Sequence, residues 1–176
     1  VTLWANASST NGFASPITSR DDNPSNVHGF IVYNDNGGNW NNWTGNAVGV
    51  GTWDQLSGGP VSTDTWTHLA LSYDAATNTK SFYVDGSLAN TKNTGALYSP
   101  NGTVESENLH IGSGGDSGGE FFFSGNIDDV SIWNTALDEA TILNIKDNGV
   151  TSAIPEPSSL GLLALGCLAL VRRRRS

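Results

Sequence analysis

Residues 79–91, TKSFYVDGSLANT, carry the clearest indication of how this chain folds. Phe82 and Val84 stand two residues apart, which is typical of a strand that buries one face. The pair Asp85–Gly86 follows, and it suits a two-residue type I′ turn, because both central residues of that turn need positive φ. The stretch therefore predicts a β-hairpin. Asp85 is assigned to its turn in the first place, and a role as a ligand is only the second interpretation.

Short runs of the same kind recur along the chain and are separated by Gly, Asn and Asp. Regularly spaced short strands with turn residues between them predict a β-sandwich or barrel with long loops. The expected strands are Val1–Ala7, Gly29–Asn34, Ala47–Thr52, Trp66–Tyr73, Lys80–Val84, Ser87–Ala89, Asn108–Gly112 and Gly125–Trp133.

One helix is expected after these strands, at Asp138–Asp147. Asp138 is a suitable N-cap, and Gly149 suits the left-handed position beyond the C-terminus. Ile142 and Ile145 form one narrow apolar stripe. We expect this helix to dock on a sheet and to serve structure only.

Charge is distributed unevenly along the 176 residues. Residues 1–152 hold sixteen acidic and four basic residues, a net charge of −12, whereas four arginines stand together at Arg172–Arg175. Such a surface disfavours DNA, RNA and anionic lipid, so no nucleic-acid partner is expected. The only cysteine, Cys167, lies in the tail, so no disulfide supports the body.

Four segments in order resemble the laminin-G-like, concanavalin A-like domains: WTHLALSYD (66–74), SFYVDG (81–86), LHIG (109–112) and GNIDDVSIWNTAL (125–137). The resemblance implies a two-sheet antiparallel jelly-roll sandwich over residues 1–150, closed by the short helix. Members of this group bind carbohydrate or protein surfaces, often with calcium.

The segment GGNWNNWTGN (37–46) is the best candidate for ligand contact. Trp40 and Trp43 offer apolar faces beside the amides of Asn42 and its neighbours, which is the combination that sugar rings need. The alternative is that one tryptophan packs inward and the other pairs across strands.

Calcium is the candidate ion. Asp128 and Asp129 are adjacent in an expected strand and should point to opposite faces, so they do not naturally chelate one ion. The resemblance favours Asp128 as a ligand or a hydrogen-bond acceptor. Arg20–Asn23 is a second acidic segment, expected as a loop, and calcium needs about six to eight oxygens from converging segments.

Catalytic residues are not apparent. Glu105 and Glu107 would share one face of a strand, but the Glu-x-Asp-x-x-Glu pattern of related glucanases lacks its third acid here. His68 is expected to be packed and hydrogen-bonded. We therefore predict no enzymatic activity, with a glycoside hydrolase of the same fold as an alternative.

The tail differs from the body in hydropathy and in charge. A linker at 151–159 contains Pro155, Glu156 and Pro157, followed by an apolar run from Leu160 to Val171 and a basic end at 172–176. As a helix the run would be about 18 Å long, shorter than a hydrocarbon core of about 30 Å. Its flanking arginines Arg172, Arg173, Arg174 and Arg175 nevertheless favour a membrane helix with a cytoplasmic C-terminus.

These three parts together resemble the PEP-CTERM sorting signal of Gram-negative bacteria. The resemblance implies an exosortase-type membrane protease that removes the tail. The protein would then pass from the inner membrane to the outer surface or the extracellular matrix, and its membrane contact would be transient.

The leading hypothesis is an exported, non-enzymatic jelly-roll module that acts at the cell surface or in a matrix. The alternative is an adhesion module with a defined glycan or surface-protein ligand. Because Val1–Ala7 already alternates like a strand and no methionine precedes it, we also expect that an export signal and a first strand belong upstream.

Overall fold

The computed structural model describes residues 1–23, 26–45, 53–94, 108–115 and 119–154. Within these ranges the chain forms ten strands, one α-helix and one 3₁₀ turn. They are β1 (Thr2–Ala7), β2 (Ala14–Asn23), β3 (Asn26–Asn34), β4 (Asn39–Gly45), β5 (Trp53–Pro60), β6 (Trp66–Asp74), β7 (Thr79–Val84), β8 (Ser87–Asn93), β9 (His110–Ile111), β10 (Gly125–Ser131), α1 (Glu139–Asn148) and η3 (Val150–Ala153).

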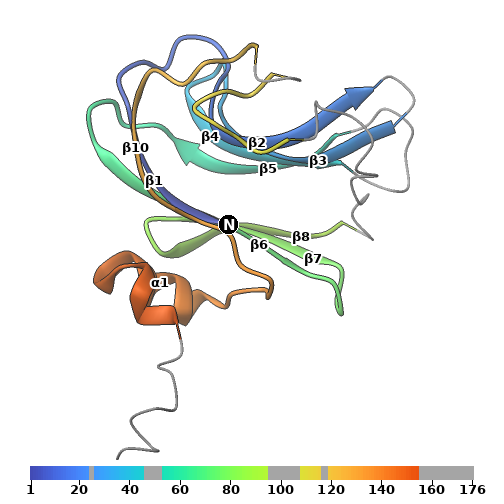
Figure 1. The fold of residues 1–176 in the computed structure, drawn as a ribbon, viewed down its shortest axis with the longest axis vertical. Coiled ribbons are helices and arrows are strands. Elements are labelled where there is room, and N and C mark those ends of the chain that lie inside the picture. Colours follow the sequence, from blue (N-terminus) through green and yellow to red (C-terminus); the bar gives the residue numbers. More distant parts are fainter. Residues whose placement is uncertain (24–25, 46–52, 95–107, 116–118, 155–176) are drawn as a thin grey trace, which may run out of the picture.

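The strands make two five-stranded sheets that lie face to face, with α1 against the outside of one of them (Figure 1). Sheet A has the order β10-β1-β6-β7-β8, and sheet B has the order β5-β4-β3-β2-β9. Every pairing between named strands is antiparallel. The predicted two-sheet sandwich with one short C-terminal helix is confirmed.

The hairpin predicted from residues 79–91 is present as β7 and β8. Val84 pairs with Ser87, and the two residues between them have φ angles of 52° at Asp85 and 81° at Gly86, as a type I′ turn requires. The Asp85 carboxylate also accepts a hydrogen bond from the backbone N–H of His68 at 2.9 Å. Asp85 therefore fixes the turn to the neighbouring strand β6.

Three strands were not predicted from the sequence. β2 contains Pro16 and the segment Arg20–Asn23, which the sequence predicts as an acidic loop and which instead is the part of β2 that pairs with the start of β3. β4 is rich in asparagine, and β5 ends in Gly-Gly-Pro. Their composition is typical of turns, but pairing within sheet B overrides that local preference. The expected strand Ala47–Thr52 lies outside the described residues.

The core lies between the sheets. Alternate residues of β1, β6 and β7 meet alternate residues of β2, β3, β4 and β5, as one buried face per sheet requires. The fully buried members are Leu3, Ala5, Ala7, Ile17, Val32, Trp40, Leu56, Leu69 and Phe82.

A buried lysine links the two sheets beside this core. Lys80 of β7 is fully buried, and its Nζ donates to Thr44 Oγ1 at 3.0 Å and to the Asp54 carbonyl at 2.7 Å. Burial lowers the pKa of Lys80 to about 8, which the nearby Asp54 carboxylate opposes. Lys92 and Thr94 in turn donate to the Asp54 carboxylate. The ammonium is therefore satisfied by groups of the opposite sheet.

The predicted helix is confirmed as α1, with Asp138 as its N-cap. The Asp138 carboxylate accepts a hydrogen bond from the Thr141 backbone N–H at 2.8 Å. Ile142 and Ile145 are its buried residues, and Ile142 packs on Ala70 of the outer face of sheet A. The predicted docking face is correct.

Replacing Asp138 with Ala should lower the free energy of unfolding by about 1 kcal/mol, because a helix N–H loses its acceptor. Chemical denaturation measures the change. Asp138→Asn serves as control, since its side-chain oxygen keeps the cap and stability should change little. Equal losses in both variants would show that the cap is not the cause.

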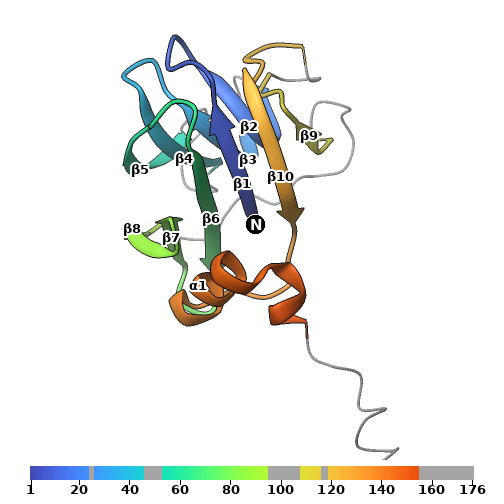
Figure 2. The same cartoon turned by 90° about the vertical axis from the view of Figure 1, so that its left-hand side faces the viewer.

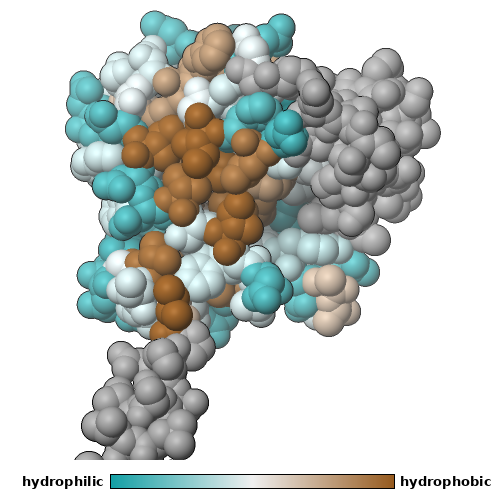
Figure 3. All heavy atoms as spheres, in the orientation of Figure 1, coloured by the Kyte–Doolittle hydropathy of each residue, from teal (hydrophilic) through white to brown (hydrophobic). Residues whose placement is uncertain are grey.

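Apolar side chains gather on the side of the sandwich where β9 and β10 are the edge strands (Figure 3). Ile111 and Ile132 are more than half exposed, and Phe122 is two-thirds exposed. Ile127 and Val130 of β10 lie beneath, at the border of the core. Among the described residues, this edge therefore leaves apolar side chains of the border of the core partly exposed.

The predicted membrane segment from Leu160 to Val171 lies outside the described residues. In the part of the chain that the structure describes, no helix is long and apolar enough to cross a membrane.

Candidate functional site

The outer face of sheet B, which points away from the core, carries a row of aromatic side chains. Strand alternation puts Trp40, Asn42 and Thr44 toward the core and Trp43 on the outside. Trp43 pairs with Ile31 of β3, and two residues further on Tyr33 lies on the same face. The row therefore crosses neighbouring strands side by side.

These aromatic rings contact one another edge to face. Tyr33 and Trp43 have ring centroids 5.2 Å apart at 79°, and Phe13 lies 5.5 Å from Tyr33 at 62°. Phe121, from the segment before β10, adds a ring 5.9 Å from Tyr33. Such edge-to-face packing holds large side chains in fixed orientations, so the group forms a preorganised wall.

The guanidinium group of Arg20 lies among these aromatic rings. Arg20 of β2 is only 6% exposed, and its guanidinium lies 5.8 Å from the Trp53 ring centroid and 5.5 Å from that of Phe121. Its Nη1 donates to the Tyr33 hydroxyl at 3.2 Å. Stacking against aromatic faces stabilises a guanidinium that water no longer surrounds.

Together these residues enclose a pocket of about 560 Å³. Its lining is Phe13, Arg20, Tyr33, Trp43, Gly119, Glu120 and Phe121. The volume falls in the range of small-ligand sites, which combine apolar walls with a few placed polar groups. The pocket can therefore hold a small ring with an apolar face and hydrogen-bonding substituents.

An amide supports the edge of this face. Asn41 lies opposite Tyr33 in the β3–β4 pairing, and its Nδ2 donates to the Asp35 carboxylate at 2.6 Å. The other Asp35 oxygen accepts from the backbone N–H groups of Gly37 and Asn39, both at 2.8 Å. The turn between β3 and β4 is thereby fixed beside the aromatic row.

The structure separates the three residues that the sequence proposed for ligand contact. Trp40 is 1% exposed and packs in the core against Phe123, and Asn42 is fully buried with its Nδ2 donating to the Ile31 carbonyl. Trp43 is half-buried and lines the pocket. A ligand on this face reaches Trp43, whereas Trp40 and Asn42 lie on the opposite side of the sheet.

Asp128 and Asp129 lie on β10 of sheet A, whereas the pocket lies on sheet B, and both are exposed. Pairing with β1 shifts register here, and Asp129 has a φ of 47°, so a bulge interrupts the simple alternation expected for the pair. The Asp128 carboxylate accepts from the Asp129 N–H at 2.8 Å. Among the residues described, no three His, Cys, Asp or Glu side chains converge on one point.

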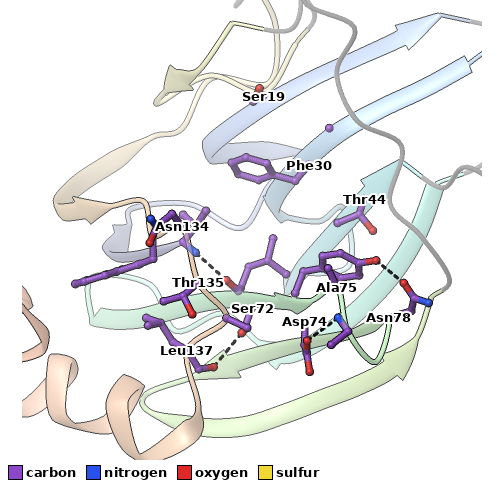
Figure 4. A pocket seen from close by; sticks show the side chains of 17 residues that line it. Ser19, Phe30, Thr44, Ser72, Asp74, Ala75, Asn78, Asn134, Thr135 and Leu137 are labelled. Atoms are coloured by element: carbon purple, nitrogen blue, oxygen red, sulfur yellow. Dashed lines mark hydrogen bonds between the residues drawn. The ribbon is translucent and has the colours of Figure 1, made fainter.

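A larger cavity, of about 1030 Å³, opens between the two sheets near the start of α1 (Figure 4). Phe30 of sheet B and Leu71 of sheet A face it. Its only charged side chain among the described lining residues is Asp74, which already accepts from Ala76 N and Thr77 Oγ1, both at 2.9 Å. This carboxylate is committed to its own turn, so the outer pocket is the better candidate site.

Comparison with protein families agrees with this architecture. A laminin G family model, described as the concanavalin A-like lectin/glucanases superfamily, matches residues 1–143. The chain belongs to the concanavalin A-like lectin/glucanase superfamily. The resemblance identified from the four sequence segments is confirmed, and the family covers the whole of both sheets.

Solved structures of carbohydrate-binding proteins share the superfamily fold. The CBM40 of the Ruminococcus gnavus IT-sialidase superimposes with a TM-score of 0.68 at 17% identity, over 82% of this chain and 80% of that one. It has also been solved bound to α2,3-sialyllactose. Domain 4 of the Geobacillus stearothermophilus arabinanase AbnA, in complex with arabinotriose, gives 0.57 at 15% identity over 82% and 64%.

The heptameric SAP-like pentraxin of Limulus polyphemus gives a TM-score of 0.57 at 18% identity, over 85% of this chain and 70% of that one. A comparison with functionally curated proteins found no match.

The tail matches a second model, the PEP-CTERM protein-sorting motif, at residues 153–175. The match spans Pro155, Glu156, Pro157, the apolar run and the arginines, so the predicted resemblance is confirmed. This motif indicates export to the cell surface. Glu105 and Glu107, considered for hydrolysis, lie outside the described residues.

Proposed function

We propose that this protein is an exported, non-catalytic carbohydrate-binding module, and that its ligand occupies the aromatic pocket on the outer face of sheet B. The observation that carries the proposal is the fixed wall of Phe13, Tyr33 and Trp43 around the buried Arg20. Aromatic faces bind the C–H faces of sugar rings, and the polar groups orient the hydroxyls. Membership of a lectin and glucanase superfamily supports this ligand class.

Arg20 favours an acidic sugar in this pocket. Arg20 is the basic side chain among the described residues that line the pocket, Glu120 is the acidic one, and the guanidinium supplies a counter-charge for a ligand carboxylate. Guanidinium groups pair with carboxylates through parallel N–H donors. The sialyllactose complex of the Ruminococcus module, which has the same fold, supports a sugar acid as ligand.

Replacing Trp43 with Ala should weaken glycan binding by about tenfold or more, since a central aromatic contact commonly contributes more than about 1.4 kcal/mol. A glycan array followed by isothermal titration with the best sugar measures the loss. Phe122→Ala is the matched control, because this exposed ring does not line the pocket and binding should be unchanged. Equal binding by all three proteins would place the ligand elsewhere.

For the tail, we propose that the motif directs the chain to an exosortase-type protease in the inner membrane of a Gram-negative cell. The run from Leu160 to Val171 would be a transient membrane helix, and Arg172–Arg175 would hold its end in the cytoplasm. The released body, residues 1–150, would then act at the outer surface or in the extracellular matrix.

Replacing Glu156 with Ala should block removal of the tail while membrane retention persists, because the apolar run and the arginines are unchanged. Mass spectrometry of the surface-released protein and of the membrane fraction measures this in a host with the sorting protease. Replacing Ser158 with Ala, one residue beyond the motif, is the control. Recovery of released protein that still contains Arg172 would contradict tail removal.

A further inference from the structure

The outer face of sheet A carries a second set of aromatic and amide side chains, on the side of the sandwich opposite the proposed pocket. Figure 2 looks onto this face, with β6, β1 and β10 side by side and α1 across their lower end. α1 covers Ala70 and Tyr83. Trp66, at the start of β6, lies beyond the helix and is 44% exposed.

Two rows of side chains cross this uncovered part. In one row Asn6 of β1 pairs with Trp66 on one side and with Asn126 on the other. In the next row Trp4 pairs with His68 and with Asp128. Because neighbouring strands lie about 4.8 Å apart, each row is about 10 Å wide, and the rows are stacked along the strands.

The scaffold of this face is rigid, and two of its side-chain amides are not used by the described part of the protein. β1 is paired on both sides, and Trp4 packs edge to face on the buried His68 with centroids 5.2 Å apart. Within the described ranges, however, the side-chain amides of Asn6 and Asn126 make no hydrogen bond. An exposed indole beside two unengaged amides is suited to a sugar ring, which needs both kinds of contact.

The charge on this face selects the kind of sugar. Asp128 and Asp129 are exposed along β10, and Lys146 of α1 is paired with Asp147 at 2.6 Å. Acidic glycans and anionic membranes are therefore repelled, in contrast to the pocket that contains Arg20. Trp66 and Asn126 are exposed and α1 covers only the lower end of the strands, so a polysaccharide chain can lie across the strands above the helix.

We infer that the surface formed by Trp4, Asn6, Trp66, Asn126 and Asp128 binds neutral polysaccharide chains. It lies on the outside of sheet A, whereas the proposed pocket lies on the outside of sheet B. With both surfaces occupied, one module joins two glycan chains. This joining function rests on the proposed function of the pocket, whereas binding to the sheet A surface does not.

Affinity electrophoresis of the full chain in native gels tests the surface. The gels contain a mixed-linkage β-glucan or a galactomannan as neutral probes, or polygalacturonate as the acidic one. The wild type should be retarded by at least one neutral probe. In Trp66→Ala, the dissociation constant for that probe, obtained from mobility at several probe concentrations, should rise about tenfold. Leu88→Ala is the control, since Leu88 is 43% exposed on the same sheet but lies on β8.

Asn126→Ala, which removes an exposed amide, gives a second variant if Trp66→Ala fails to fold, and it should also weaken retardation. Trp43→Ala should keep the neutral retardation and lose glycan binding at the pocket. The inference would be overturned if neither neutral polysaccharide retards the wild type. It would also be overturned if Trp66→Ala and Asn126→Ala are retarded as strongly as the wild type. Loss of all binding in Trp43→Ala alone would overturn it too, while leaving the proposed pocket in place.

Discussion

Replacing Trp40 with Ala should lower the free energy of unfolding by about 3–5 kcal/mol, the cost of deleting a large aromatic side chain from a packed core. Trp40 is 1% exposed, and it is among the largest fully buried side chains of the described residues. It comes from sheet B and packs with core residues of both sheets, so no neighbour can fill its volume without moving a strand. Chemical denaturation measures the loss.

Trp40→Phe separates the effect of the size of the side chain from the effect of its indole N–H. Among described residues the Trp40 Nε1 has no hydrogen-bond partner, so phenylalanine removes a buried unsatisfied donor and keeps most of the ring. The loss should then be clearly smaller than that of Trp40→Ala, because the cavity left behind is smaller. Trp43→Ala should also cost less than Trp40→Ala, because Trp43 is half-buried. A Trp40→Ala variant as stable as the wild type would contradict the core placement.

Local turn chemistry explains why the hairpin and the helix could be predicted. Asp85–Gly86 specifies a turn that few other dipeptides allow, and a side chain at Gly86 would also meet Leu143 of α1 at 2.8 Å. Asp138 likewise specifies a helix start through its own side chain. Both signals lie within a few residues of the structure that they determine, so neither depends on distant contacts.

The aromatic pocket could not be assembled in this way. The sequence suggested one segment, Trp40 to Trp43, because two tryptophans stand close together among amides. Strand alternation sends these two side chains to opposite faces, a consequence of β4 being a strand rather than a loop. Arg20 and Phe121 reach Trp43 only through the order of strands and the path of the segment before β10, which no local pattern contains.

A search for residues that alternate with period two could have identified more of the residues on the outer face of sheet B. Once Asn39–Gly45 is assigned as a strand, Trp43 and Asn41 share its outer face, and the same reasoning places Tyr33 on the outer face of β3. The obstacle was composition, since Asn and Gly are depleted in strands and favour turns. The face on which each side chain of β4 lies can thus be predicted only once the segment is known to be a strand, and its Asn and Gly residues do not indicate one.

His68 should make the protein lose stability as the pH falls from about 6.5 to about 4. The side chain is 1% exposed, and burial lowers its pKa to about 4, against the opposing effect of the Asp85 carboxylate. Between those pH values the unfolded chain binds a proton that the folded chain does not, so protonation favours unfolding. A shift of this size corresponds to roughly 3 kcal/mol, present in full above the unfolded pKa and lost near pH 4.

His68→Gln isolates this effect, because it removes the titrating group and keeps a polar side chain beside Trp4. Carboxylates also titrate near pH 4, so the quantity to measure is the difference in free energy of unfolding between wild type and variant, by denaturation at several pH values from 4 to 7.5. That difference should move against the wild type as the pH falls, most steeply between about 4.5 and 6. A difference that stays constant over this range would mean that His68 is protonated as readily in the fold as in the unfolded chain, and that its packing against Trp4 does not exclude water.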